Sequence, residues 1–146
     1  MKRLAVLTVI AVFAQVGCGG GGGDGGGNPA PRPPTVDVTG TWDASMTVIG
    51  GDTSLPVGYH WTGVFTVIQS DSTASGTFVT SVGGSGNVSG SVSGEDLDMT
   101  ITQTSPCAGT YSGIGMVNSA SNQMSGTYIG VDCYGIPQTS FTATKR

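Results

Sequence analysis

The chain has 146 residues, a formal net charge of −4 and only 10% charged residues. Five residues are Lys or Arg, and none of them lies between Arg32 and Lys145. The chain therefore offers few cations to phosphates, so neither nucleic acid nor anionic lipid headgroups are expected partners. Its length allows one domain with a modest core. A charge-poor sequence dominated by Gly, Ser and Thr is unusual for a cytosolic enzyme and favours an exported β-protein.

The amino terminus has the basic and apolar regions of a signal peptide. Lys2 and Arg3 form a short basic region, and an apolar run of eleven residues follows at 4–14. This run is too short to span a bilayer, but it has the length of a signal-peptide core. We therefore expect residues 1–17 to be a signal peptide that is removed on export.

Small residues precede a cysteine directly after this core. The sequence Val16-Gly17-Cys18 resembles the lipobox of bacterial lipoproteins, although Gln15 stands where that family usually has an aliphatic residue. The resemblance implies that Cys18 carries palmitate or a similar acyl chain and anchors the protein in the cell envelope. Gly19 follows in place of the Asp that resembles an inner-membrane retention signal, which favours the outer membrane, facing the periplasm or the cell surface. The alternative is an ordinary cleaved signal with an incidental cysteine.

A linker separates this anchor from the rest of the chain. Eight of the nine residues at 19–27 are glycine, and the segment 28–34 contains four prolines. The first composition is typical of a flexible tether and the second of a stiffer, extended spacer. We expect a lipidated cysteine and linker over 18–34 and one folded domain over 35–146.

The domain has the alternation of β-strands. From 41 to 48 apolar and polar residues alternate, so one face carries Trp42, Ala44, Met46 and Val48. No stretch shows helical periodicity, and turn residues separate the segments. Because eight sequential antiparallel strands leave unpaired edges unless the sheet closes, we predict an all-β, eight-stranded antiparallel up-and-down barrel rather than a sandwich. The expected strands lie at 41–48, 58–69, 74–80, 86–93, 97–103, 110–117, 123–131 and 138–144.

Two glycine-containing segments are expected to leave the sheet. Gly50, Gly51 and Asp52 should form a turn or loop after the first strand. Gly135 and Pro137 should likewise form the turn before the last strand.

The segment between Cys107 and Cys133 is predicted to fold as a hairpin. Both cysteines lie thirteen residues from Ala120, which is the midpoint of a polar run. A hairpin centred there places the cysteines opposite each other, so we expect a disulfide between them. The same register pairs Met116 with Met124 on one apolar face.

The start of the first strand carries a family resemblance. Gly40, Thr41 and Trp42 have the G-x-W pattern that resembles lipocalins and avidins, the calycin group. The resemblance implies that a terminal basic side chain packs over the tryptophan at the closed end of the barrel, and Arg146 is the residue assigned to that role. Avidin-like biotin sites also use tryptophans on later strands, whereas the only other tryptophan here is Trp61, which argues against biotin.

Binding is the expected function, with no cofactor. We expect a non-catalytic, membrane-anchored envelope module, monomeric, whose barrel holds a small apolar ligand. Its alternatives are a barrel filled by its own side chains, or a periplasmic inhibitor or protein-interaction module acting through loops at 50–58 or 131–138. The candidate ligand-binding residues share large apolar or aromatic side chains. They are Met46, Tyr59, Trp61, Phe65, Phe78, Met99, Met116, Met124, Tyr128 and Phe141.

Catalytic and metal-binding patterns are not found in the sequence. His60 is the only histidine, and alternation places it on a polar face without an acid–base partner, so we expect no enzyme activity. Glu95, Asp96 and Asp98 lack the spacing of a calcium loop and are expected to form a solvated turn. One histidine and a cysteine pair cannot supply the ligands of a zinc site.

Overall fold

The computed structural model describes Ala30 and residues 32–146. The predicted signal peptide, the predicted lipidation site at Cys18 and most of the predicted linker lie outside the described residues. Residues 31–146 form a compact unit with its own hydrophobic core. Within the described part of the chain, no helix is long and apolar enough to cross a membrane.

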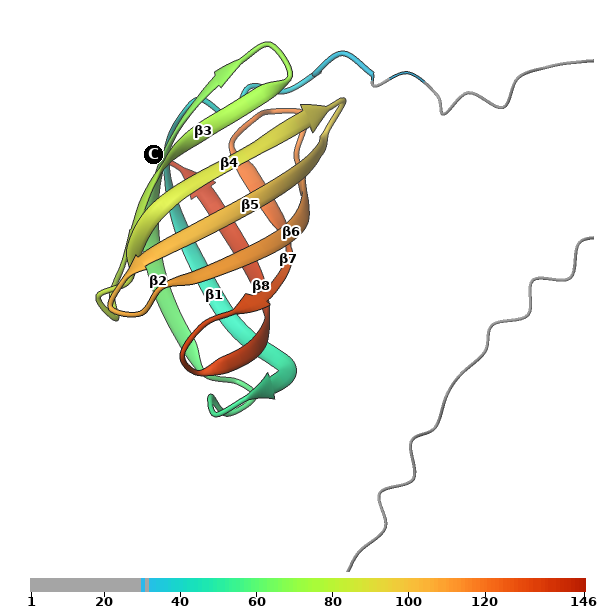
Figure 1. Cartoon of the computed structure of the whole chain (residues 1–146). Coiled ribbons are helices and arrows are strands. Elements are labelled where there is room, and N and C mark those ends of the chain that lie inside the picture. The colour runs from blue at the N-terminus through green and yellow to red at the C-terminus, as the bar shows by residue number, and fades with distance from the viewer. Residues whose placement is uncertain (1–29, 31) are drawn as a thin grey trace, which may run out of the picture. The chain divides into compact units, whose positions relative to one another are not determined.

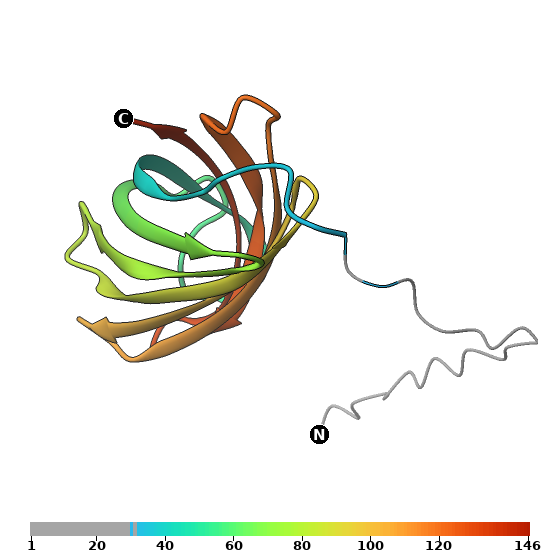
Figure 2. The same cartoon turned by 90° about the horizontal axis from the view of Figure 1, so that it is seen from above.

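A closed ring of eight strands forms this unit, as predicted. Each strand pairs antiparallel with the next, and the last strand returns to pair with the first. Figure 1 shows the strands side by side around the barrel, and Figure 2 shows the ring from above. The strands are β1 (Gly40–Thr53), β2 (His60–Ser70), β3 (Thr73–Thr80), β4 (Ser85–Ser93), β5 (Asp96–Ser105), β6 (Gly109–Val117), β7 (Gln123–Val131) and β8 (Gly135–Lys145).

Inside the barrel, large aromatic side chains lie against glycines of the neighbouring strands. A Cβ atom at Gly126 would lie 2.8 Å from Phe141 Cε1, and one at Gly115 would lie 3.1 Å from its Cζ. Tyr128 stands in the same way against Gly113, where a Cβ would lie 2.6 Å from the tyrosine Cβ. The missing side chains therefore give the rings their room, which is how a small barrel encloses aromatic residues.

The β6–β7 hairpin has a different register from the predicted one. Val117, and not Met116, pairs with Met124, while Met116 pairs with Ser125. A shift of one residue exchanges the two faces of a strand. Met116 is accordingly 58% exposed on the outer surface, and its predicted place in the interior is wrong.

The turn explains this register. Asn118 Oδ1 accepts hydrogen bonds from the backbone N–H groups of Asn122 and Gln123, both at 3.0 Å. Ser121 adopts a φ of 55°, in the left-handed region. The loop between the paired residues Asn118 and Gln123 therefore has four residues, whereas a hairpin centred on Ala120 requires an odd number.

The predicted turns at Gly50–Asp52 and at Gly135 and Pro137 are also wrong. Gly51 pairs with Pro137 and Thr53 with Gly135, so β1 and β8 continue as a ladder past the other strands (Figure 1). The register shifts between Val48 and Gly50, which marks a bulge. Gly51 has a φ of +102°, and a Cβ there would collide with the Ile136 backbone. These glycines therefore permit a bent ladder instead of ending the strands.

Candidate functional site

One end of the barrel is closed by residues that precede β1. Val36 and Val38 are 6% and 1% exposed, respectively. The Val38 N–H donates to Gln69 Oε1 at 2.9 Å, and Gln69 Nε2 donates to the Val36 carbonyl at 3.3 Å. Trp42, which is fully buried, donates from Nε1 to the Val38 carbonyl at 2.9 Å. These hydrogen bonds fix the segment 36–38 over the core at this end of the barrel.

The basic side chain over Trp42 is Lys145, and not Arg146 as the family resemblance implied. Lys145 Nζ lies 5.5 Å from the Trp42 ring centroid and donates to the Asp37 carbonyl at 3.1 Å. Arg146 instead donates to both carboxylate oxygens of Asp43 at the surface. Lys145 pairs with Trp42 across the β1–β8 ladder, and successive residues of a strand point to opposite faces. Position 145 therefore faces the tryptophan, and position 146 does not.

The opposite end is open and holds a cavity of about 210 Å³. Residues from all four connections at this end line it, including Leu55, Val82, Pro106 and Asp132. Seven of the nine aromatic side chains in the described residues line the same cavity. They are Tyr59, Trp61, Phe65, Phe78, Tyr111, Tyr128 and Tyr134.

The aromatic residues of the open-end cavity contact one another in pairs. Tyr59 and Trp61 have ring centroids 5.7 Å apart, and Phe65 and Phe78 are stacked at 5.3 Å. Tyr111 meets Tyr128 edge to face at 5.6 Å. These distances are those of favourable aromatic pairs, so each pair stabilises its own part of the cavity wall.

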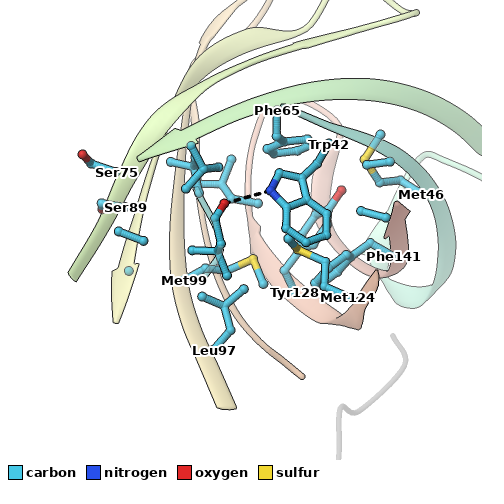
Figure 3. A pocket seen from close by; sticks show the side chains of 18 residues that line it. Trp42, Met46, Phe65, Ser75, Ser89, Leu97, Met99, Met124, Tyr128 and Phe141 are labelled. Atoms are coloured by element: carbon cyan, nitrogen blue, oxygen red, sulfur yellow. Dashed lines mark hydrogen bonds between the residues drawn. The ribbon is translucent and has the colours of Figure 1, made fainter. Parts of the chain in front are cut away.

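A smaller, apolar cavity of about 60 Å³ lies between the open-end cavity and the closed end. Trp42, Met99, Met124 and Phe141 are among its lining residues (Figure 3). It shares Met46, Phe65, Ile101 and Tyr128 with the open-end cavity, so these side chains form the partition between the two.

One carboxylate, together with several residues that carry hydroxyl or amide groups, lies among the aromatic residues that line the open-end cavity. The Tyr111 hydroxyl donates to Asp132 Oδ2 at 2.6 Å, and the Tyr134 backbone N–H donates to Asp132 Oδ1 at 2.7 Å. Burial and the Asp132 carboxylate raise the pKa of Tyr111, and burial raises the pKa of Tyr128. The Thr139 hydroxyl is fully buried near Tyr128, and no hydrogen bond of ordinary geometry joins it to any described residue.

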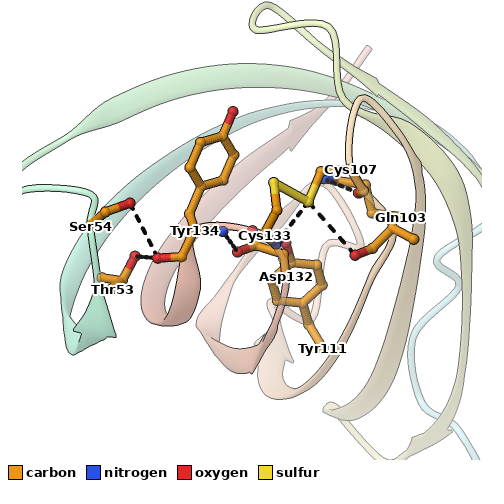
Figure 4. The surroundings of a disulfide bond; sticks show 9 residues. Thr53, Ser54, Gln103, Cys107, Tyr111, Asp132, Cys133 and Tyr134 are labelled. Carbon is orange, nitrogen blue, oxygen red and sulfur yellow. Dashed lines mark hydrogen bonds between the residues drawn. A yellow bond between two sulfur atoms is a disulfide. The ribbon is translucent and has the colours of Figure 1, made fainter.

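The predicted disulfide lies at the rim of this cavity, beyond the ends of β6 and β7. The Cα atoms of Cys107 and Cys133 are 5.9 Å apart, and Cys133 separates Asp132 from Tyr134 (Figure 4). Gln103 Nε2 donates to the Cys107 carbonyl at 2.9 Å. The bridge therefore holds the connection that carries the only carboxylate of the cavity.

The side of this rim next to β1 is also fixed by hydrogen bonds. Thr53 Oγ1 and Ser54 Oγ donate to the Tyr134 carbonyl at 3.0 and 3.3 Å. The 132–134 connection is thus held by β1 on one side and by the disulfide on the other.

The sequence-predicted binding residues divide between the two cavities. Met99, Met124 and Phe141 line the smaller cavity alone. Tyr59, Trp61 and Phe78 line the open-end cavity alone, and Met46, Phe65 and Tyr128 line both. Of the ten candidates, only Met116 lines neither.

Tyr111 and Thr139 are cavity residues that the sequence did not indicate, whereas Asp132 and Tyr134 were indicated only as part of the candidate loop at 131–138. Tyr111, Asp132 and Tyr134 lie within four residues of a cysteine, so the disulfide is a signal that could have grouped them. Thr139 carries no such signal because a threonine on an alternating strand is expected to be solvated.

The outer surface shows no catalytic arrangement at His60. Its Nε2 lies 2.8 Å from Ser45 Oγ on the neighbouring strand, within hydrogen-bond distance. At the acidic turn, Asp96 pairs with Arg32 at 3.3 Å. Residues 30 and 32–146 contain no group of three or more His, Cys, Asp or Glu side chains that could hold a metal ion.

The eight-stranded antiparallel barrel is compatible with a calycin-like fold. The resemblance seen in the sequence implied a terminal basic side chain over the tryptophan of the first strand. In the structure Lys145, at the end of β8, has this position over Trp42. No protein-family model matches the chain, and the search of curated proteins found no significant match.

Proposed function

We propose that the domain is a non-catalytic binding module that takes a small, largely apolar ligand through the open end of its barrel. The observation that carries this proposal is the open-end cavity of about 210 Å³, walled by seven aromatic side chains. The other end is closed by Val36, Val38 and Lys145, so a ligand has one route in.

The cavity volume sets the size of the ligand. Pockets for drug-sized molecules measure roughly 300–1,000 Å³, whereas an engineered apolar cavity of about 150 Å³ binds benzene. A cavity of about 210 Å³ therefore suits one ring with a short substituent. Met46, in the partition toward the smaller cavity, has the flexible side chain that would adapt to ligands of different length.

Membrane anchoring is part of the same proposal. The support is the basic, apolar and small-residue pattern that ends at Cys18, followed by the glycine-rich tether. A lipid on Cys18 would hold the barrel at the envelope membrane, most consistently the outer membrane. Mass spectrometry of the mature protein should find an acylated Cys18 as its first residue, and Cys18→Ser should release the protein into the soluble fraction. A mature chain that begins elsewhere would contradict the anchor.

Apolar side chains around the mouth support a second candidate, a protein-interaction module. Val57 is 73% exposed, Val82 50% and Tyr134 43%, and all three lie in connections that border the cavity. Such a rim could dock an envelope protein over the mouth. Val57→Asp, at a residue that does not line the cavity, should weaken a protein contact of this kind while leaving small-molecule binding in place.

The test of ligand binding uses residues 31–146 in the oxidised form, because this unit has its own core and a closed sheet. Native mass spectrometry should detect a reproducible co-purified adduct, and ligand-detected NMR should detect binding of toluene or indole. Thr80→Phe places a ring in the cavity and should abolish both signals. Val79→Phe, on the outer face of the same strand, is the matched control and should retain them.

One result of this test would contradict the proposal. If the wild-type domain yields neither an adduct nor probe binding, the cavity is not a binding site for small apolar molecules.

A further inference from the structure

Asp132 is the only charged side chain that lines the open-end cavity. Its carboxylate stands among aromatic residues, with Tyr111 donating to one oxygen and the Tyr134 backbone donating to the other. Each carboxylate oxygen can accept more than one hydrogen bond, so both retain acceptor capacity. The site therefore combines one negative charge with an apolar surround.

No basic side chain in the described part of the chain compensates this charge. Arg32 pairs with Asp96, and Arg146 pairs with Asp43. Lys145 lies over Trp42 at the closed end, and His60 bonds Ser45 on the outer face. These four are the only Lys, Arg and His residues from position 32 onward.

The walls of the cavity favour the same charge in a ligand. The face of an aromatic ring is electronegative and attracts ammonium groups, with tryptophan the strongest and tyrosine next. Trp61 and four tyrosines line the cavity together with Asp132. An organic cation is therefore attracted both by the carboxylate and by the ring faces, whereas an anion is repelled by the carboxylate.

The carboxylate is held ready for a ligand. The Cys107–Cys133 bridge follows Asp132 directly, and Thr53 and Ser54 bind the Tyr134 carbonyl on the other side. A charge that is already ordered in the free protein costs less entropy to use in binding.

We propose that the ligand of the open-end cavity is an organic cation: a protonated amine attached to a single ring or a comparably small apolar body. Asp132 and the aromatic walls would bind its charge. This inference rests on the proposed function, because it names the chemical class of that ligand.

The test compares three probes that share one ring and differ in charge. They are 2-phenylethylammonium, its neutral analogue propylbenzene and the anion 3-phenylpropanoate, each titrated into oxidised residues 31–146 by NMR. The cation should bind at least tenfold more tightly than propylbenzene, and the anion should bind most weakly. Propylbenzene binding as tightly as the cation would overturn this inference and leave the proposed function standing. Failure of all three probes would overturn both.

Two isosteric variants locate the effect. Asp132→Asn keeps an acceptor for Tyr111 while removing the charge, and it should reduce the preference for the cation over propylbenzene to the smaller part that the aromatic walls supply. Asp98→Asn makes the same change on the outer face of β5 and should preserve the tenfold preference. A full tenfold preference that survives in a folded Asp132→Asn domain contradicts the assignment. The wild-type probe series decides the matter if that variant does not fold.

Discussion

The two ends of the barrel use the same strand alternation for opposite purposes. At the closed end the Trp42 indole, the Gln69 amide and the Lys145 ammonium each have partners, and the residues around them are almost fully buried. At the open end the Asp132 carboxylate has no ionic partner among the described residues. Polar groups that are satisfied internally stabilise a fold, whereas groups left unsatisfied next to a cavity are available to a ligand.

The distribution of side-chain size accompanies this difference. Val38, Val92 and Val117, at the closed end, are each 1% exposed. At the open end Tyr59 is 37% exposed and Tyr134 43%, although both rings are larger. At the closed end, small branched residues pack without leaving space between them. At the open end, large rings on strand ends and connections leave space between them.

The largest expected effect on stability is at Trp42. Trp42→Ala removes a fully buried ring and leaves the Val38 carbonyl without its donor, so it should lower the free energy of unfolding by about 3–5 kcal/mol. Trp61→Ala, at the partly exposed open end, should cost much less stability and should weaken ligand binding instead. Urea denaturation measures both. Equal losses from the two substitutions would mean that the ends do not differ in packing.

The disulfide comes next in size. In the loop-entropy model, closing the 26-residue separation between Cys107 and Cys133 stabilises the fold by roughly 3.5 kcal/mol. Reduction should therefore lower the melting temperature by roughly 10–20 °C. The Cys107→Ser/Cys133→Ser double variant should melt at the reduced temperature and should not respond to reductant. A wild-type melt that is unchanged by reductant refutes the stabilising role.

Alkaline pH should destabilise the open end through its tyrosines. The pKa values of Tyr111 and Tyr128 are raised in the folded state, chiefly by burial, whereas an unfolded tyrosine titrates near pH 10. Their contribution to stability is therefore fully present below pH 10 and is lost as the pH rises above it, because the unfolded chain releases those protons first. Urea midpoints between pH 8 and 11 measure the loss.

Tyrosinate absorbance supplies the control for this prediction. Tyr128→Phe keeps the ring but cannot titrate, so its stability should fall less steeply above pH 10. If all four tyrosines ionised near pH 10 while circular dichroism remained native, the burial of these two hydroxyls would be disproved.

Strand number and closure could be predicted from the sequence because they depend on local patterns. Alternation from Trp42 to Val48 and regularly spaced turn residues specify eight strands, and open edges are costly. The pairing of the two late cysteines also followed, although its supporting register was off by one residue. A disulfide tolerates that error because the bridge lies beyond the ladder ends.

Two features could not be predicted in the same way: which residues of β6 face the interior, and the volume of the cavity. The β6–β7 register depends on how Asn118 caps its turn, and that single choice places Met116 outside. The sequence predicts that Gly51 and Gly135 are turn residues, but both lie within the bent β1–β8 ladder. Whether the large side chains inside the barrel fill it or leave about 210 Å³ depends on ring orientations that no strand pattern encodes.

The smallest expected effect distinguishes the last two residues at the closed end. Lys145→Gln removes the cation above Trp42 and the bond to the Asp37 carbonyl, so it should lower the free energy of unfolding by about 0.5–1 kcal/mol. Arg146→Gln breaks only an exposed ion pair with Asp43 and should leave stability unchanged within error. Urea denaturation of both variants at low and high salt measures the difference. The reverse order would mean that Arg146 covers the tryptophan, which requires the end of β8 to shift by one residue against β1.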